Sequence, residues 1–236
     1  MDISHIVKLS VFIHTLAGFI GLLFFWILIF KKKGTNSHKK IGQVFYYSLI
    51  VVCFTSILNG TIYLVADAFF YQNIKPHLGY GVVMILQGLL SVLPAYYGQL
   101  ALKSIETLPS QKTLKLHIMY LSFLVLYVVI NQFFAVKLDY FLLQFYSFSA
   151  APLTIFLCLF FVYRLKKQKN SKKELLTSHV VLSIVAGIAI HVGFFVGGFS
   201  TKFLLRSPTN TEYAGVIFGM VVVGVVYTET LRRRLK

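Results

Sequence analysis

Acidic residues are scarce in this chain of 236 residues, which has seven of them against 23 lysine and arginine residues. None stands in the middle of a long apolar stretch; they are Asp2, Asp67, Glu106, Asp139, Glu174, Glu212 and Glu229. Transporters that couple to protons or sodium normally carry their ionisable ligands at membrane depth. The scarcity of acids therefore weakens that class of function.

Cysteine is rarer still, and both cysteines, Cys53 and Cys158, lie inside apolar runs and outside any CxxC motif. That placement gives no support to a disulfide framework and fits small apolar residues in a helical core. The HExxH, GxSxG, P-loop and GxGxxG motifs are also absent. The common metalloprotease, hydrolase and nucleotide-binding activities therefore have no sequence support.

Apolar residues are abundant, at 57% of the chain, with a mean hydropathy of +0.77. An apolar run of about 20 residues crosses a bilayer as one helix. The sequence predicts a single all-α integral membrane bundle over residues 1–236. Its seven transmembrane helices are expected at about 6–30, 41–65, 78–102, 117–136, 141–163, 177–199 and 213–230.

The basic residues are unevenly distributed between the predicted loops. Eighteen of the 23 lie in four segments, 31–40, 103–115, 164–173 and 232–236, and the others fall in the alternate segments. By the positive-inside rule, this bias places the N-terminus outside and the C-terminus in the cytoplasm of a bacterial-type inner membrane. We expect these charges to contact anionic headgroups rather than nucleic acid, because none belongs to a soluble module.

The last predicted helix carries Gly215, Gly219 and Gly224. A G-x-x-x-G pattern permits close helix packing. Packing inside the monomer and a homo-oligomer both remain open.

Two histidines are predicted at the same depth in the outer half of the membrane. His14 and His191 each lie eight residues from a predicted outer helix end, or about 12 Å deep. Gln87 and Asn59 are expected near this level and complete a predicted polar layer. Polar side chains at such depth are expensive and are functional candidates by default.

Three further histidines are predicted at the inner surface, where they open helices: His38, His117 and His179. Imidazole suits haem iron, zinc and copper, and it titrates near neutral pH. His179 and His191 would project about 120° apart, so one cofactor, or none, fits better than two. The alternatives are neutral imidazoles bonded between helices for the outer pair, and solvated or headgroup-bonded residues for the inner three.

The stretch from His14 to Gly42 contains an H-x-x-x-G motif, a basic turn and the motif H-K-K-I-G. This pattern resembles a family of bacterial multipass proteins called domain of unknown function 2306. The likeness covers about residues 10–135 and implies shared roles for His14, His38 and His117. The segment LHIMYLS around His117 departs from the arginines and tryptophan common there in the family. H-K-K-I-G is also faintly similar to the haem-binding helices of b561-type cytochromes.

These observations favour a membrane redox or metal-cofactor protein that binds haem b or a transition metal. His14 and His191 would form an outer site, and His38, His117 and His179 an inner one. The alternative is a non-enzymatic carrier or accessory subunit with structural histidines. A third interpretation is an enzyme that acts on lipids, with a metal bound at the inner site. The lack of a carboxylate that could partner the metal weakens this interpretation.

Overall fold

The computed structural model describes residues 3–70, 74–138, 150–167, 171–193 and 222. In this part of the chain the structure is all-helical, as the sequence predicts. The helices are α1 (Ile3–Phe30), α2 (Asn36–Phe70), α3 (Ile74–Lys103), α4 (Gln111–Leu138), α6 (Ala151–Lys166) and α7 (Lys172–Val192).

Five of the described helices, all except α6, are long and apolar enough to cross a membrane. Large apolar side chains also point outward from the bundle, including Phe12, Phe54, Phe123 and Phe156, each more than 60% exposed. An outer surface of this kind suits lipid rather than water. The helices thus support a multipass membrane protein.

The predicted helix at 213–230, with its glycines, lies outside the described residues. So do the beginning of the predicted helix at 141–163 and the end of the one at 177–199. The number of seven helices and the orientation of the termini therefore stay predictions.

The α2 and α4 helices begin earlier than predicted, and polar residues cap both of them. The α2 helix starts at Asn36 rather than 41, where Gly34 turns the chain with a φ of 80° and the Thr35 hydroxyl accepts the His38 N–H at 3.2 Å. The α4 helix starts at Gln111 rather than 117, where the Ser110 hydroxyl accepts the Thr113 N–H at 3.1 Å. Hydropathy assigned these polar turns to loops, whereas capping makes them helical.

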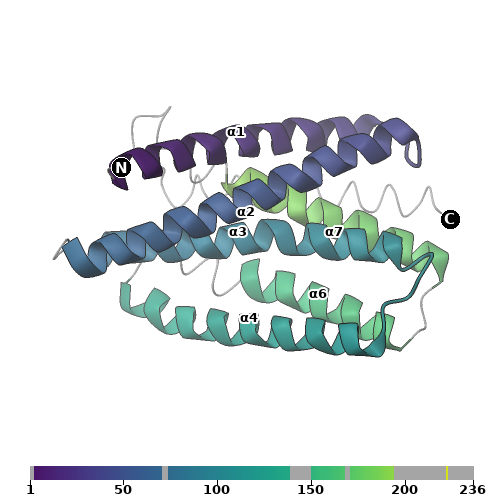
Figure 1. The fold of residues 1–236 in the computed structure, drawn as a ribbon. Coiled ribbons are helices and arrows are strands. Elements are labelled where there is room, and N and C mark those ends of the chain that lie inside the picture. Colours follow the sequence, from purple (N-terminus) through teal and green to yellow (C-terminus); the bar gives the residue numbers. More distant parts are fainter. Residues whose placement is uncertain (1–2, 71–73, 139–149, 168–170, 194–221, 223–236) are drawn as a thin grey trace.

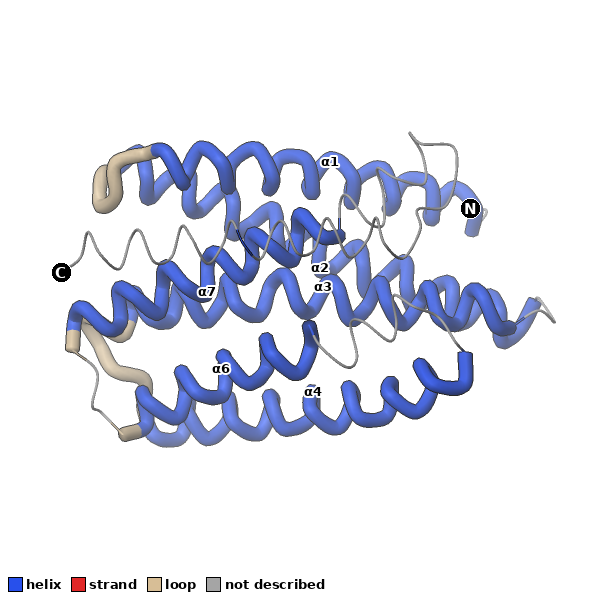
Figure 2. The backbone as a smooth tube through the Cα atoms, turned by 180° about the vertical axis from the view of Figure 1, so that it is seen from behind, coloured by secondary structure: helices blue, strands red, loops and turns tan. Residues whose placement is uncertain are grey.

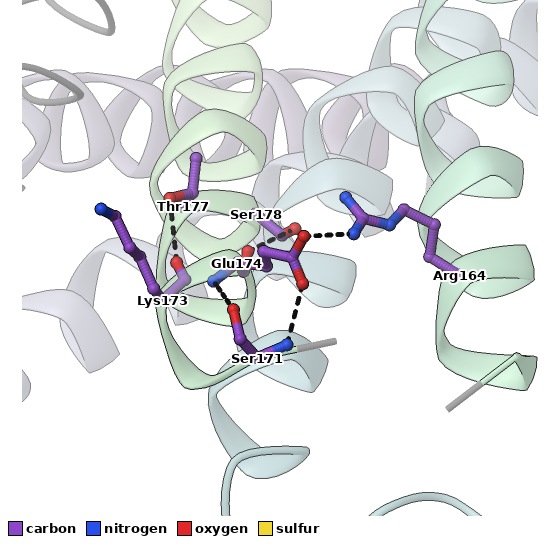
Figure 3. A network of polar contacts seen from close by, with 6 residues as sticks. All are labelled: Arg164, Ser171, Lys173, Glu174, Thr177 and Ser178. Atoms are coloured by element: carbon purple, nitrogen blue, oxygen red, sulfur yellow. Dashed lines mark hydrogen bonds and ion pairs between the residues drawn. The ribbon is translucent and has the colours of Figure 1, made fainter. Parts of the chain in front are cut away.

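The start of α7 is fixed by the network in Figure 3. The Ser171 hydroxyl accepts the Glu174 N–H at 3.3 Å, and the Glu174 carboxylate accepts the Ser171 N–H at 2.8 Å. This capping box begins α7 at Lys172 instead of 177. The same carboxylate accepts a bond of 2.6 Å from Arg164 of α6, so the cap also joins two helices.

The helices form three rows in Figure 1, with α1 and α2 on one side, α3 and α7 in the middle, and α4 and α6 on the other side. The α3 helix contacts α2, α4, α6 and α7. In its most apolar stretch 67% of residues are buried, compared with 22–44% in the other four candidate spans. The α3 helix is therefore the centre of the described bundle.

Glycines let α2 approach α3 closely. A Cβ atom on Gly60 would lie 2.5 Å from the carbonyl oxygen of Gly81, and one on Gly81 would lie 2.8 Å from that of Gly60. Further along, a Cβ on Gly88 would lie 2.8 Å from the Ser56 Cβ. Since no larger residue fits these contacts, small residues set the distance between the two helices.

The basic connections gather at one end of the bundle. The turn between α1 and α2, the loop between α3 and α4, and the ends of the link between α6 and α7 all lie at that end in Figure 2. The described parts of three of the four lysine-rich and arginine-rich segments therefore lie at one end of the bundle.

We predict that Gly60→Val separates α2 from α3 and destabilises the fold by about 1–3 kcal/mol, as overpacking generally does. The unfolding temperature in detergent should fall by about 2–10 °C. Gly42→Val is the matched control on the same helix, because a Cβ there meets the Leu28 side chain at an ordinary 3.8 Å. Equal temperatures for the two variants would contradict the close crossing.

Candidate functional site

His14 of α1 bonds to α2. Its Nδ1 atom lies 3.0 Å from the Thr55 hydroxyl oxygen and 3.3 Å from that of Ser56. The Thr55 hydroxyl already donates to the carbonyl oxygens of Val51 and Val52, at 2.8 and 3.1 Å. With this proton on the backbone carbonyls, the Thr55 oxygen is able to accept from the His14 ring, and the tautomer of His14 decides which ring nitrogen carries the proton.

One turn from this bond, two buried polar side chains face an apolar interior. Ser10 precedes His14 by one turn of α1, and Asn59 follows Thr55 by one turn of α2. Because the two helices are antiparallel, Ser10 and Asn59 lie at the same height along the bundle. Asn59 is 0% exposed and Ser10 is 4% exposed. Neither the Asn59 amide atoms nor the Ser10 hydroxyl has a hydrogen-bond partner among the described residues.

We call this group the polar seam; it consists of Ser10, His14, Thr55, Ser56 and Asn59. Its hydrogen-bonding groups are neutral side chains, and it runs along the contact between α1 and α2. Ser56 also packs against Gly88, so the seam reaches α3. Side chains with unmade hydrogen bonds at membrane depth point to a ligand or to bound water.

His191 lies in a different environment. It is 2% exposed, and its Nδ1 lies 2.6 Å from the Gly187 carbonyl oxygen of its own helix. Its ring meets Phe25 and Trp26 edge-on, with centroids 5.2 and 5.6 Å apart. A side chain on Gly187 would overlap the Phe25 ring, so this glycine sets how α7 packs on α1.

The structure does not bring His14 and His191 together. The aromatic residues that touch His191 follow His14 on α1 by about three turns, or about 16 Å of helix. The depths inferred from predicted helix ends are therefore misleading, because packing of Gly187 on Phe25 sets the level of α7. A cofactor role for either histidine stays a prediction.

The predicted polar layer is divided between two interfaces. Asn59 belongs to the polar seam. Gln87 lies between α3 and α7, where a Cβ on Gly193 would overlap its amide nitrogen. Gln87 precedes Gly88, which packs on Ser56. Gln87 and Asn59 therefore lie at a similar height along the bundle, but in different helix–helix contacts.

The inner histidines also separate. His179 places Nδ1 2.9 Å from the Gly98 carbonyl oxygen of α3, and it interacts electrostatically with His38 and Lys33. His117 instead packs its ring on Tyr96 and Tyr97, with centroids 5.7 and 5.6 Å away. His179 therefore bonds to the backbone of α3, and His117 belongs to an aromatic cluster between α3 and α4.

Within the described residues, no three His, Cys, Asp or Glu side chains are grouped so that they could hold a metal ion. Cys53 and Cys158 are both buried and free. Sequence reasoning missed Ser10, Thr55 and Ser56. The signal was present, since Ser10 with His14 and Thr55 with Asn59 repeat polar residues every fourth position inside apolar helices.

No family model matches the chain, and neither a curated protein nor a solved structure does. The resemblance to domain of unknown function 2306 therefore stays a prediction. The function has to be argued from the geometry of the polar seam and of the histidines.

We predict a coupling of about 0.6 kcal/mol between His14→Leu and Thr55→Val in a double-mutant cycle, the usual size for hydrogen bonds between membrane helices. Unfolding in detergent measures it. A cycle of His14→Leu with Ser122→Ala is the control, because the exposed Ser122 bonds within α4, and it should give no coupling. Coupling of His14 to His191 but not to Thr55 would refute the assignment.

Proposed function

We propose that this protein is a non-enzymatic multipass membrane carrier in which the histidines join helices and the polar seam binds a small neutral polar solute. The observation that carries the proposal is Asn59, whose amide is fully buried in a candidate membrane span and has no hydrogen-bond partner among the described residues.

An unpartnered amide in an apolar interior costs about 2–7 kcal/mol, depending on the reference state. A leucine at that position would avoid the cost, so stability alone does not explain Asn59. A solute that pairs with the amide during transport does explain it, because the unmade bonds are then available to the ligand.

The donors and acceptors of the polar seam suggest the class of solute. The Asn59 amide offers two N–H donors and a carbonyl oxygen, and Ser10 offers a hydroxyl. No carboxylate, lysine or arginine belongs to the described seam, so a charged solute would have no counter-charge. A neutral compound with several hydroxyl or amide groups, such as a polyol or a simple amide, fits best.

A haem or metal function is the second candidate, and one observation favours it. His179 bonds through Nδ1 to a backbone carbonyl oxygen, as His191 does, and His14 bonds through Nδ1 to a hydroxyl. Metal-ligating histidines often hold one ring nitrogen in such a bond and bind through the other. This candidate is weaker, because the described contacts of His14 and His191 lie on different turns of α1.

The orientation belongs to the same proposal. The basic connections at one end of the bundle support a cytoplasmic location for that end in a bacterial-type inner membrane (Figure 2).

We expect Asn59→Leu to raise the unfolding temperature by about 2–10 °C, because it removes an unsatisfied buried amide worth about 1–3 kcal/mol. His14→Leu, which breaks a bond to α2, should lower it. A panel of neutral polyols and amides should stabilise the wild-type protein but not Asn59→Leu. If Asn59→Leu destabilises as much as His14→Leu, Asn59 is structural and the proposal fails.

The purified protein should show no Soret band and no stoichiometric transition metal. An absorption spectrum together with metal analysis tests this. A stoichiometric signal that is lost on His14→Leu or His191→Leu would establish the second candidate in place of the carrier.

A further inference from the structure

The polar seam is one part of a longer line of contacts between α1 and α2. Within the seam, His14 bonds to hydroxyl groups of α2. Two turns further along α1, a Cβ atom on Gly21 would lie 2.9 Å from the Ser48 hydroxyl oxygen of α2. One more turn along, the rings of Phe25 and Phe45 meet, with centroids 5.7 Å apart. The two antiparallel helices therefore stay in contact from the seam to these two rings.

The two ends of the polar seam are covered unequally. We call the end of the bundle that carries the basic connections the basic end (Figure 2). Between the seam and this end lies one cluster of buried apolar side chains, which we call the apolar plug: Ala17, Leu22, Phe25, Phe45, Leu49, Val52, Ala95, Ala186 and Ile190. Beyond the seam in the other direction, none of the described residues 5–9 of α1 and 61–65 of α2 is buried. The seam is therefore closed most thickly toward the basic end.

Phe25 joins the three helices that form most of the apolar plug. Its ring centroid lies 5.7 Å from that of Phe45 on α2 and 5.2 Å from that of His191 on α7. The ring also rests in a notch on α7, where a Cβ atom on Gly187 would overlap it. A single side chain of α1 thus closes the contacts of its helix with both α2 and α7.

The notch is a specific feature of α7, because glycine is less favourable than alanine inside a helix. Gly187 lies within the continuous helix Lys172–Val192, and it leaves space that the Phe25 ring occupies. Ring contacts of this kind are apolar and individually weak. The ring can therefore leave the notch when α1 shifts slightly against α7, whereas the hydrogen bonds of His14 still join α1 to α2 at the seam.

We propose that Phe25 is a gate that closes the polar seam toward the basic end. A solute at the seam leaves toward that end when the Phe25 ring moves off Gly187. This inference rests on the proposed function, because it adds a direction of release and a closing residue to the neutral solute site at Asn59.

A thiol placed behind the gate tests it without any solute. Val52 is 3% exposed and lies on α2 between Phe45 and the seam residue Thr55, so a reagent from the basic end reaches Val52→Cys only past Phe25. The two native thiols, which are free and buried, are replaced by alanine.

The full-length protein is treated in sealed membrane vesicles of both orientations with a membrane-impermeant methanethiosulfonate. A separate variant, Lys39→Cys, places a thiol at an exposed position of the basic end and identifies the vesicles that present this end to the reagent. The rate at which Val52→Cys is modified is then measured in those vesicles. A rate as high as that of Lys39→Cys, with Phe25 in place, would overturn the gate.

We expect Phe25→Ala to raise the rate at Val52→Cys by about tenfold or more. Modification follows the population of the open form, and minor conformations are commonly populated at only about 0.1–10%. Phe19→Ala is the matched control, because it removes a ring of the same helix that is 57% exposed. Equal rates in the two variants overturn the gate. If Phe25→Ala does not fold, Phe25→Leu and Phe19→Leu, which keep an apolar side chain, give the same comparison.

The outcomes separate the gate from the solute site. Faster modification in Phe25→Ala, together with no stabilisation of the wild-type protein by polyols or amides, supports the gate and contradicts the proposed solute. Stabilisation by a polyol, together with equal rates in Phe25→Ala and Phe19→Ala, supports the solute and overturns the gate.

Discussion

The close crossing of α2 and α3 is the constraint on which the rest of the bundle depends. Gly60, Gly81 and Gly88 leave no room for larger side chains, so they fix the level and spacing of the two helices. Ser56 then packs on α3 with its Cβ while its hydroxyl lies within bonding distance of His14 on α1. One short side chain thus links three helices, and the level of the polar seam follows from the glycine contacts. Such a dependence on close contacts is expected inside a lipid bilayer, because packing and hydrogen bonds, rather than burial from water, hold membrane helices together.

The sequence predicts the existence of the helices well because long apolar runs have few other solutions in a membrane. The helix starts are less accurate, and the reason is local chemistry. Thr35, Ser110 and Ser171 cap polar turns that a hydropathy profile assigns to loops, and each extends its helix by about one or two turns. The capping box of Ser171 and Glu174 was readable as S-x-x-E, so this part of the difference could have been predicted.

The positions of the histidines are harder to predict than the helix starts. They depend on how far helices that are distant in the sequence are shifted along their axes relative to one another. A depth counted from a helix end assumes that the ends are level across the bundle. In the structure, the Phe25 ring of α1 packs directly on Gly187 of α7, and this contact sets the axial position of α7 relative to α1. The two residues are 162 positions apart in the sequence. A single sequence holds no signal for that contact. The i, i+4 polar repeats that define the seam are local, and they could have been found.

The described histidines differ in role because they differ in what their Nδ1 atom bonds to. His14 bonds to a hydroxyl of α2 and His179 to a backbone carbonyl oxygen of α3, so each ring joins two helices. His191 bonds within α7 and packs its ring against the aromatic residues Phe25 and Trp26 of α1. Among the described residues, the buried polar atoms without a hydrogen-bond partner include the Asn59 amide and the Ser10 hydroxyl at the polar seam, and the Tyr97 hydroxyl outside it. Neutral polar groups can stay at membrane depth without a counter-ion, and charged groups cannot. This is the physical reason for proposing a neutral rather than a charged solute at the polar seam.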